Sequence, residues 1–282
     1  MTRSVSESAA RRRFGALVTQ PDEAIDLAEA ALLIACEEYP DLDLHACRAQ
    51  LAELGAGARA RVAPERGLHG KARALSGFLF DELGFRGNSD HYYDPRNSFL
   101  NDVLERRLGI PISLSALYIE VGRRAGLDVE GVGLPGHFIV RVAGQADLAL
   151  IDPFHGGALL TPGDCQRRLD RIFEGKLTLD DGMLQPCGTR QMLMRMLYNL
   201  KGIYVQAQDH LRALGAVELL LLLEPACYDE LRDRGLLYAA LDCYGRAIHD
   251  LNDYLERAPR VPEAAELRTT IETLRARQAR VN

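Results

Sequence analysis

The stretch that decides the fold is residues 129–154, which read VEGVGLPGHFIVRVAGQADLALIDPF. Its apolar residues form three short, β-rich or alternating runs, a pattern typical of strands. Gly144 and Gln145 separate the second run from the third, and glycine at the first central position suits a two-residue type II′ turn. The stretch is therefore expected to form antiparallel strands. The three runs are residues 129–134, 137–142 and 148–151.

Symmetric pairing about that turn would set residue 143 opposite residue 146 and His137 opposite Asp152. Side chains directly opposite each other on one face of a hairpin lie within hydrogen-bond reach. A carboxylate placed there fixes the imidazole tautomer and stabilises its protonated form, as catalysis requires. The same geometry also serves a structural pair that satisfies two buried polar groups, so both interpretations stay open at this point.

Before this stretch, apolar residues recur at helical spacing from Pro21 to about Leu83, which predicts a helical N-terminal region. A polar break at residues 86–90 precedes two further helices. Helices followed by antiparallel strands indicate an α+β core. The two helices are expected at residues 97–108, with Asn97 or Ser98 as N-cap, and after Gly109, with Pro111 in the first turn and the end near Ala125.

After Cys187 the chain returns to helical spacing and contains an internal repeat with the tetratricopeptide period of about 34 residues. Lys201 stands where the first repeat needs a small residue, whereas the second repeat has Gly235. Residues 262–281 are charged and are expected to form a capping helix. The repeated positions are Leu197, Tyr204, Ala213, Val217 and Pro225, followed by Leu231, Tyr238, Ala247, Leu251 and Pro259.

Four motifs in the middle of the chain resemble the transglutaminase-like fold of bacterial proteins of the SirB type. They are Gly109-Ile110-Pro111-Ile112-Ser113-Leu114-Ser115, Arg123-Arg124-Ala125-Gly126-Leu127, Pro135-Gly136-His137 and Ile151-Asp152-Pro153. The segment Tyr93–Asn101 and the C-terminal repeats are similar to the same family. The resemblance implies an α+β core of the papain-like cysteine-protease superfold, with N-terminal helices and a C-terminal all-α tetratricopeptide-type repeat section.

Three parts of the chain are expected from these patterns and from the resemblance. Residues 1–90 would form the N-terminal helical region, and residues 91–185 the transglutaminase-like core. Residues 190–282 would form two tetratricopeptide-type repeats and the capping helix. Stacks this short need packing against another surface to be stable, so the repeats could serve either a partner or the core.

The resemblance implies a catalytic cysteine that this chain lacks. Active transglutaminase-like enzymes resemble one another in a Gly-x-Cys that opens the core helix, where the helix N-terminus lowers the pKa of the thiol. Gly109-Ile110-Pro111 falls on that motif, so Pro111 occupies the position of the nucleophile. His137 and Asp152 carry over to the histidine and aspartate of the family.

Two serines of the core helix are candidates to replace the missing cysteine. Ser113 lies about 200° around the helix from Pro111, whereas Ser115 lies on nearly the same face but ~6 Å deeper along the axis. Serines within helices usually bond to the preceding turn, which is the structural alternative for both. His155 could join His137 and Asp152 in a metal site, but the spacing does not establish three ligands.

Composition excludes several classes of function. The net charge of −6 offers no basic surface for neutralising phosphates, which disfavours nucleic-acid binding. Residues 1–14 lack an apolar h-region, and no later stretch is apolar for long enough to span a membrane. The six cysteines show no C-x-x-C spacing, which argues against a zinc site or a disulfide framework. We expect a cytoplasmic protein with no metal site and no cofactor.

These observations favour a non-catalytic binding or scaffold protein that engages a protein or peptide partner through its repeats or its core cleft. The alternative is a hydrolase or acyl-transfer enzyme in which His137, oriented by Asp152, acts as general base on water or on Ser115. A third interpretation, suggested by relatives of the family, is a regulator of gene expression. In an acidic chain this effect would have to run through protein partners.

Overall fold

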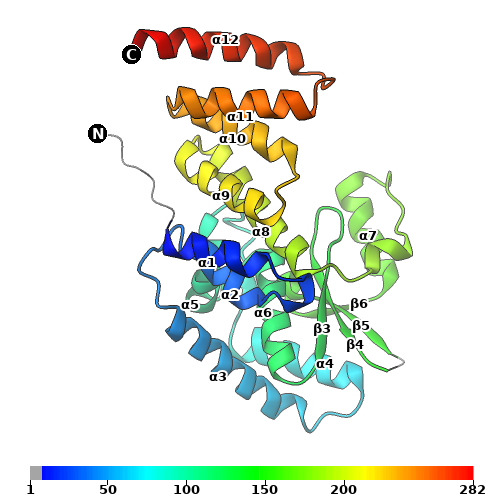
Figure 1. Cartoon of the computed structure of the whole chain (residues 1–282). Coiled ribbons are helices and arrows are strands. Elements are labelled where there is room, and N and C mark those ends of the chain that lie inside the picture. Colours follow the sequence, from blue (N-terminus) through cyan, green and yellow to red (C-terminus); the bar gives the residue numbers. More distant parts are fainter. Residues whose placement is uncertain (1–7, 146, 282) are drawn as a thin grey trace. The chain divides into compact units, whose positions relative to one another are not determined.

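The computed structural model describes residues 8–145 and 147–281 (Figure 1). They form two compact units. The first contains residues 8–13 and Gln20–Met196, and the second contains Phe14–Thr19 and residues 197–281. The boundary therefore falls within α8 (Thr189–Gln206). The three parts expected from the sequence, with limits near residues 90 and 185, stay a prediction.

A buried helix, α6 (Pro111–Arg124), is central to the first unit, and it packs against α3, β3 and β4. Its first residue is a proline, which has no N–H, at a position where an N–H would have no acceptor within the helix. Ser113 accepts the backbone N–H of Ile110 (3.0 Å) and donates to the carbonyl of Asn97 (2.5 Å). The helices before it are α1 (Ala9–Val18), α2 (Leu27–Ala35), α3 (Leu44–Val62), α4 (Leu68–Ser76), the π-helical turn η2 (Gly77–Glu82) and α5 (Leu100–Arg106).

The helix expected at residues 97–108 is shorter than predicted. Phe99 takes the N-cap position of α5, and Asn97 ends the short 3₁₀ turn η3 (Pro95–Asn97), so neither proposed N-cap residue was correct. The Asn97 side chain instead donates to the carbonyls of His91 (2.7 Å) and Tyr92 (3.2 Å). A buried amide satisfies more backbone groups in this role than as a helix cap.

Four antiparallel strands form the main sheet in the order β3, β4, β5, β6. Gly122 of α6 approaches Val129 of β3, so α6 covers the face that Val129 shares with its partner Val142. The opposite face packs against Cys165 of a helix that the sequence analysis did not predict, α7 (Pro162–Phe173). The strands are β3 (Asp128–Val132), β4 (Ile139–Ala143), β5 (Leu148–Asp152) and β6 (Ala158–Leu160), of which β6 was not predicted, and a separate parallel pair is β1 (Arg86–Gly87) with β2 (Leu108–Gly109).

The register of the β4–β5 hairpin differs from the prediction. Ala143 pairs with Leu148, so the connection contains residues 144–147 rather than two residues. Residue 146, which the predicted turn set opposite residue 143, lies outside the described residues. The shift amounts to two positions, and because side chains alternate with a period of two, each residue keeps its face. His137 and Asp152 therefore still meet.

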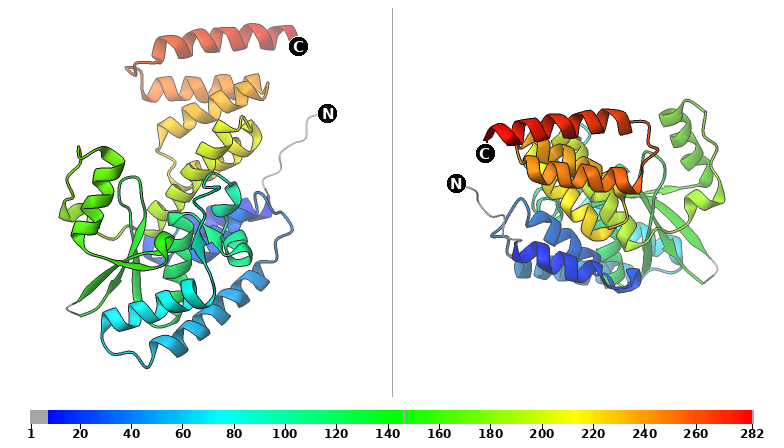
Figure 2. Two further views of the ribbon diagram at one scale, coloured as in Figure 1. Left: turned by 180° about the vertical axis from the view of Figure 1, so that it is seen from behind. Right: turned by 45° about the horizontal axis from the view of Figure 1, so that its top comes forward.

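The second unit is a stack of antiparallel helices that follow one another in chain order (Figures 1 and 2). The repeated residues Tyr204, Tyr238, Ala213 and Ala247 are all buried between them. A Cβ on Gly235 would come within 2.9 Å of the Leu251 side chain, which explains the small residue there. After α8 come α9 (His210–Leu223), α10 (Tyr228–Ala240), α11 (Tyr244–Arg257) and α12 (Ala264–Val281), the expected capping helix.

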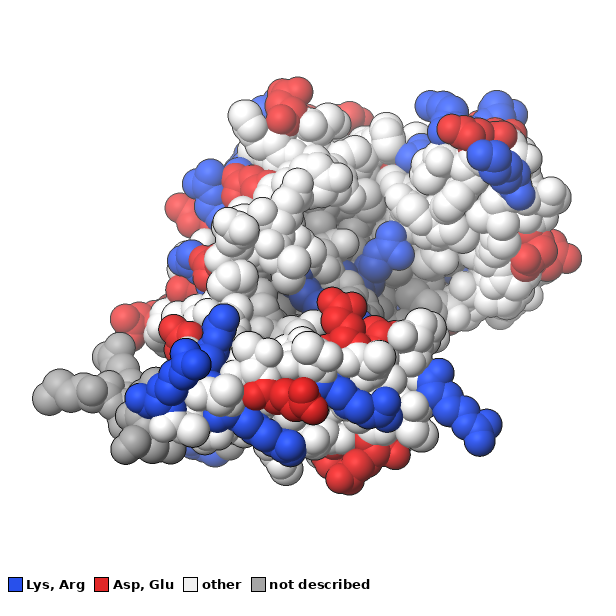
Figure 3. Space-filling view, turned by 90° about the horizontal axis from the view of Figure 1, so that it is seen from above, with Lys and Arg blue, Asp and Glu red and all other residues white. Residues whose placement is uncertain are grey.

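Among the described residues, no helix combines the length and the apolar character needed to cross a membrane. On the face shown in Figure 3, basic and acidic side chains are interspersed among uncharged ones. No continuous basic surface covers that face.

Candidate functional site

Asp152 ends β5 and is the centre of a polar cluster inside the first unit. One carboxylate oxygen, Oδ1, accepts the backbone N–H groups of Phe154 (3.1 Å) and His155 (3.3 Å), which lie in the 3₁₀ turn η4 (Pro153–His155). The other, Oδ2, lies 3.0 Å from both His137 Nε2 and His155 Nδ1. It also lies 2.6 Å from Arg168 Nη2. The carboxylate is fully buried and has several donors.

His137 is held in a tight turn just before β4. Its N–H donates to the carbonyl of Leu134 (3.0 Å), and Gly136 adopts a left-handed φ of 71° that favours glycine. A side chain on Gly136 would also approach Ile172 of α7 within 3.0 Å. The backbone around His137 is therefore constrained both by its own turn and by α7.

The imidazole Nε2 of His137 has two competing neighbours. It lies 3.0 Å from Asp152 Oδ2, which only accepts, and 3.0 Å from Arg168 Nη1, which only donates. A single ring nitrogen cannot donate to one and accept from the other at the same time. No described residue hydrogen bonds to Nδ1 of His137. Asp152 therefore favours the tautomer with a proton on Nε2, whereas Arg168 favours the tautomer with a lone pair there.

The charge states follow from the surroundings. Burial is the main influence on His137 and lowers its pKa; the hydrogen bond and the charge of Asp152 raise that pKa but do not offset burial, and Arg168 and His155 lower it a little further. Burial would raise the pKa of Asp152, but hydrogen bonds from His137 and His155 and the charge of Arg168 together hold that pKa well below its usual range. At neutral pH the cluster therefore contains a neutral His137, an ionised Asp152 and a cationic Arg168.

Arg168 is the residue of this cluster that the sequence analysis missed. It lies on α7, one turn after the buried Cys165. A signal for this helix exists: Thr161 and Asp164 form a reciprocal capping box around Pro162. That signal could have predicted α7. The placement of Arg168 against Asp152 depends on how α7 packs on the sheet.

His137, Asp152 and His155 also have the donor set of a transition-metal site, since their ligand atoms all lie within 4.8 Å of one another. The Arg168 guanidinium occupies the point where they converge. Its Nη1 lies 3.0 Å from His137 Nε2 and 3.2 Å from His155 Nδ1, while Nη2 binds Asp152. A guanidinium there satisfies the same acceptors and repels a divalent ion, so no metal chemistry is assigned to this cluster.

The structure does not bring the candidate nucleophiles to His137. The hydroxyl of Ser113 is engaged with Ile110 and Asn97. Ser115 is completely buried, and its hydroxyl has no hydrogen-bond partner in the part of the chain that the structure describes. The hydrogen bond between Ser115 and His137 that an acyl-transfer mechanism needs is not formed here.

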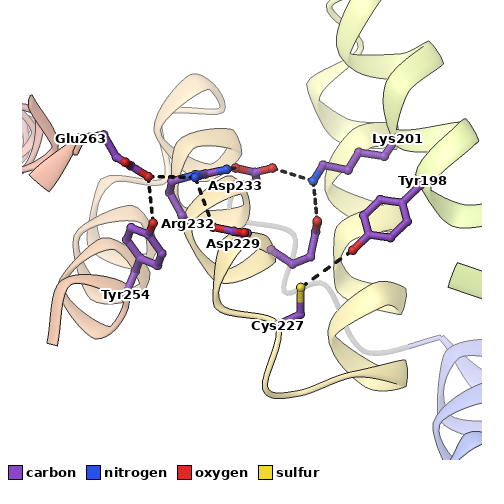
Figure 4. Close-up of polar contacts among 9 residues, drawn as sticks. Tyr198, Lys201, Cys227, Asp229, Arg232, Asp233, Tyr254 and Glu263 are labelled. Carbon is purple, nitrogen blue, oxygen red and sulfur yellow. Dashed lines mark hydrogen bonds and ion pairs between the residues drawn. The ribbon is translucent and has the colours of Figure 1, made fainter. Parts of the chain in front are cut away.

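A second polar cluster joins the helices of the repeats (Figure 4). Lys201 of α8 contacts Glu230 and Asp233 of α10, each at 2.6 Å. Arg232, also on α10, contacts Asp233 (2.8 Å) and Glu263 (3.0 Å), the latter just before α12. Lys201 thus replaces the usual small residue by an ion pair with the next helix. These contacts define the first-helix face, the face of α8 and α10 that carries Lys201 and Arg232.

Large apolar side chains are exposed on the first-helix face. Tyr198 and Val205 lie one turn before and after Lys201, and are 37% and 50% exposed. Leu236 follows Arg232 by one turn and is 40% exposed. Exposed aromatic and aliphatic side chains at consecutive turns of neighbouring helices are typical of binding surfaces.

An α+β core with a His/Asp pair, followed by helix pairs of the tetratricopeptide period, defines a transglutaminase-like protein with helical repeats. A family model described as the transglutaminase-like superfamily matches residues 45–198. A model described as the tetratricopeptide repeat matches residues 200–272. The predicted fold class is thereby confirmed. The first match begins at residue 45, so it takes in nearly all of α3 as well as α4.

Relatives align with this chain over most of their length. A UPF0162 protein of Xylella fastidiosa (strain 9a5c) is 39% identical over 249 residues, covering 87% of this chain and 89% of the relative. A UPF0162 protein of Vibrio cholerae serotype O1 is 29% identical, covering 89% and 93%. UPF0162 protein YchA of Escherichia coli (strain K12) is 26% identical, covering 86% and 91%. No solved structure matches the chain. The chain belongs to the UPF0162 family of transglutaminase-like proteins, in agreement with the resemblance to the SirB type.

Proposed function

We propose that this chain is a non-catalytic transglutaminase-like protein that binds a protein or peptide partner through its repeats. The observation that carries the first part is Pro111 at the start of α6, where the family resemblance implies the nucleophile. Ser113 is engaged elsewhere, and the buried hydroxyl of Ser115 forms no hydrogen bond to His137. A His/Asp pair without a nucleophile in reach serves here to hold the fold together.

Partner binding is supported by the first-helix face. Tyr198, Val205 and Leu236 offer apolar and aromatic anchors of the kind that dominate binding energy at interfaces. Four carboxylates surround Lys201 and Arg232, so this cluster carries excess negative charge. They are Asp229, Glu230, Asp233 and Glu263. The partner segment that complements this face combines apolar side chains with positive charge.

The six free cysteines fit a reducing compartment, and we place the protein in the cytoplasm.

The alternative, hydrolysis with His137 as general base, requires the tautomer in which Nε2–H donates to Asp152 and Nδ1 carries the lone pair. The free Nδ1 favours this alternative. Arg168 opposes it, because its Nη1 lies against Nε2 as a second donor. An effect on gene expression, the third interpretation, would likewise depend on the partner.

The partner is tested with peptides selected from a random library against the full-length chain. We expect the Tyr198→Ser, Leu236→Ser double variant to bind a selected peptide at least tenfold more weakly, since each buried anchor contributes about 1–2 kcal/mol. Leu211→Ser is the matched control, because Leu211 is 66% exposed but belongs to α9, which is not one of the two helices that form this face. Equal losses in both variants, or none, would refute the assignment.

The absence of catalysis is tested separately with a panel of p-nitrophenyl esters and γ-glutamyl amides. Wild type and His137→Gln are expected to hydrolyse each compound at the same background rate. A wild-type rate that falls by two orders of magnitude in His137→Gln would establish the hydrolase instead, since general-base catalysis contributes about 10²–10⁴-fold.

A further inference from the structure

The first unit contains a cavity of about 940 Å³ on which none of the proposed functions depends. Residues 86–94 line it together with Arg96, Arg106 and Leu108. This volume lies within the range of small-molecule sites, about 300–1,000 Å³. The cavity therefore has room for a ligand of moderate size.

Buried contacts hold the wall of the cavity in place. The N–H of Arg86 donates to the carbonyl of Arg107 (2.9 Å), where β1 pairs with β2. The buried side chains of Asn88 and Asn97 are hydrogen bonded to each other (3.0 Å), and Asn97 also holds the carbonyl of His91. A loop tied down by buried amides is already organised for binding, which reduces the entropy lost with a ligand.

The charges of the lining leave one cationic group uncompensated. Three arginines and two aspartates line the cavity, a balance of +1 in a chain whose net charge is −6. Asp94 binds Arg96 (2.8 Å) and Arg106 (3.2 Å), so its carboxylate serves both. Arg86 is exposed, and no hydrogen bond or ion pair joins its side chain to a described residue. Arg106 Nη1 is buried without an acceptor in the described part of the chain.

Aromatic rings complete the wall and connect the cavity to the His/Asp cluster. The ring centroids of Tyr92 and Tyr93 lie 5.3 Å apart in an edge-to-face arrangement, and Tyr93 is 68% exposed. The Tyr92 ring contacts Phe154 edge-on at 6.1 Å, and Phe154 contacts His137 at 6.3 Å. A ligand in the cavity would therefore lie beside the residues that surround His137.

We propose that this cavity binds a small monoanionic carboxylate ligand with a planar or apolar body. Arg86 supplies the planar guanidinium that pairs with a carboxylate through two parallel hydrogen bonds. Tyr92 and Tyr93 offer ring faces and edges to the body of the ligand. A balance of +1 neutralises a carboxylate but not a phosphate monoester, which carries about −1.5 to −2 at pH 7.

Benzoate is the probe, titrated into the full-length chain and followed by NMR of the arginine Nε–H and tyrosine ring signals. Benzamide has the same shape without the charge, and inorganic phosphate tests the competing anion. We expect benzoate to shift the signals of Arg86, Tyr92 and Tyr93 and to bind at least tenfold more tightly than benzamide or phosphate. Loss of one charge-assisted pair corresponds to roughly a tenfold change in Kd.

Variants localise the binding. Arg86→Gln is expected to weaken benzoate about tenfold, whereas Arg66→Gln, the matched control at another exposed arginine, leaves it unchanged. Asp94→Asn raises the net charge of the lining to +2 and is expected to strengthen benzoate binding several-fold. A misfolded variant would bind more weakly, so this result also shows that the variant is folded. Equal binding of benzamide, tighter binding of phosphate, or equal loss in Arg86→Gln and Arg66→Gln would each overturn the proposal.

Discussion

The two serines at the start of α6 show how one turn of helix gives identical side chains opposite roles. Ser113 accepts the N–H of Ile110 and donates to the Asn97 carbonyl, whereas the Ser115 hydroxyl is buried without a partner. Helical geometry alone predicted that Ser113 points away from the direction of Pro111. It could not reveal that the carbonyl of Asn97, sixteen residues away, accepts a hydrogen bond from Ser113.

Alanine substitutions distinguish these roles. We expect Ser113→Ala to lower the free energy of unfolding by about 1–2 kcal/mol, because it leaves a buried N–H and a buried carbonyl unpaired. Ser115→Ala should leave it unchanged or raise it by up to about 1 kcal/mol, since an unsatisfied hydroxyl is removed. Urea denaturation measures both. A large loss in Ser115→Ala would mean that its hydroxyl has a partner after all.

At the scale of elements, α7 gives the His/Asp pair a third partner, Arg168. The pair itself was predicted from the hairpin, and its hydrogen bond is present although the register was wrong by two positions. The helix that covers it was not predicted, and Cys165 and Leu169 are its only buried side chains within a strongly charged segment. Cys165, Leu169 and Ile172 nevertheless recur at helical spacing, and the capping box marks the start of the helix, so both signals could have predicted α7.

Arg168 and its neighbour Arg167 provide a matched test of α7. Arg168→Met is expected to raise the pKa of His137, because the cation that disfavours its protonation is gone. It should also destabilise the fold by about 3–5 kcal/mol, since Asp152 keeps its buried charge without that partner. Arg167→Met, at an exposed side chain, should change the free energy of unfolding by no more than about 0.5 kcal/mol. It should change the pKa of His137 by no more than the shift that corresponds to this energy. NMR titration and urea denaturation measure the two effects, and identical behaviour of the variants would exclude the role of Arg168.

At the scale of the whole molecule, acid should destabilise the protein in two stages. The folded pKa of His137 is lowered, so the unfolded chain takes up a proton first, and stability present above about pH 6.5 falls as the pH drops through that value. The folded pKa of Asp152 is also lowered, so its contribution is present above about pH 4 and is lost as the pH falls further.

Chemical denaturation at a series of pH values tests this order. His137→Gln should abolish the His137 contribution between pH 7 and 5, whose slope for one proton is at most about 1.4 kcal/mol per pH unit. Asp147→Asn, at an exposed aspartate, is the control and should retain the wild-type profile. An unchanged slope in His137→Gln would show that other groups cause the acid transition.

Local patterns in the sequence determined much of this protein: the repeat period, the helix with Pro111 in its first turn, three strands of the main sheet, and the meeting of His137 with Asp152. These depend on spacings of a few residues, and strand alternation tolerates an error of two positions in register. Only the tertiary structure decided that Arg168 lies against the His/Asp pair and that Arg86 and Arg106 line one cavity. Such contacts arise when separate elements pack together, because burial and charge pairing are optimised over the whole core, and no short stretch of sequence encodes them.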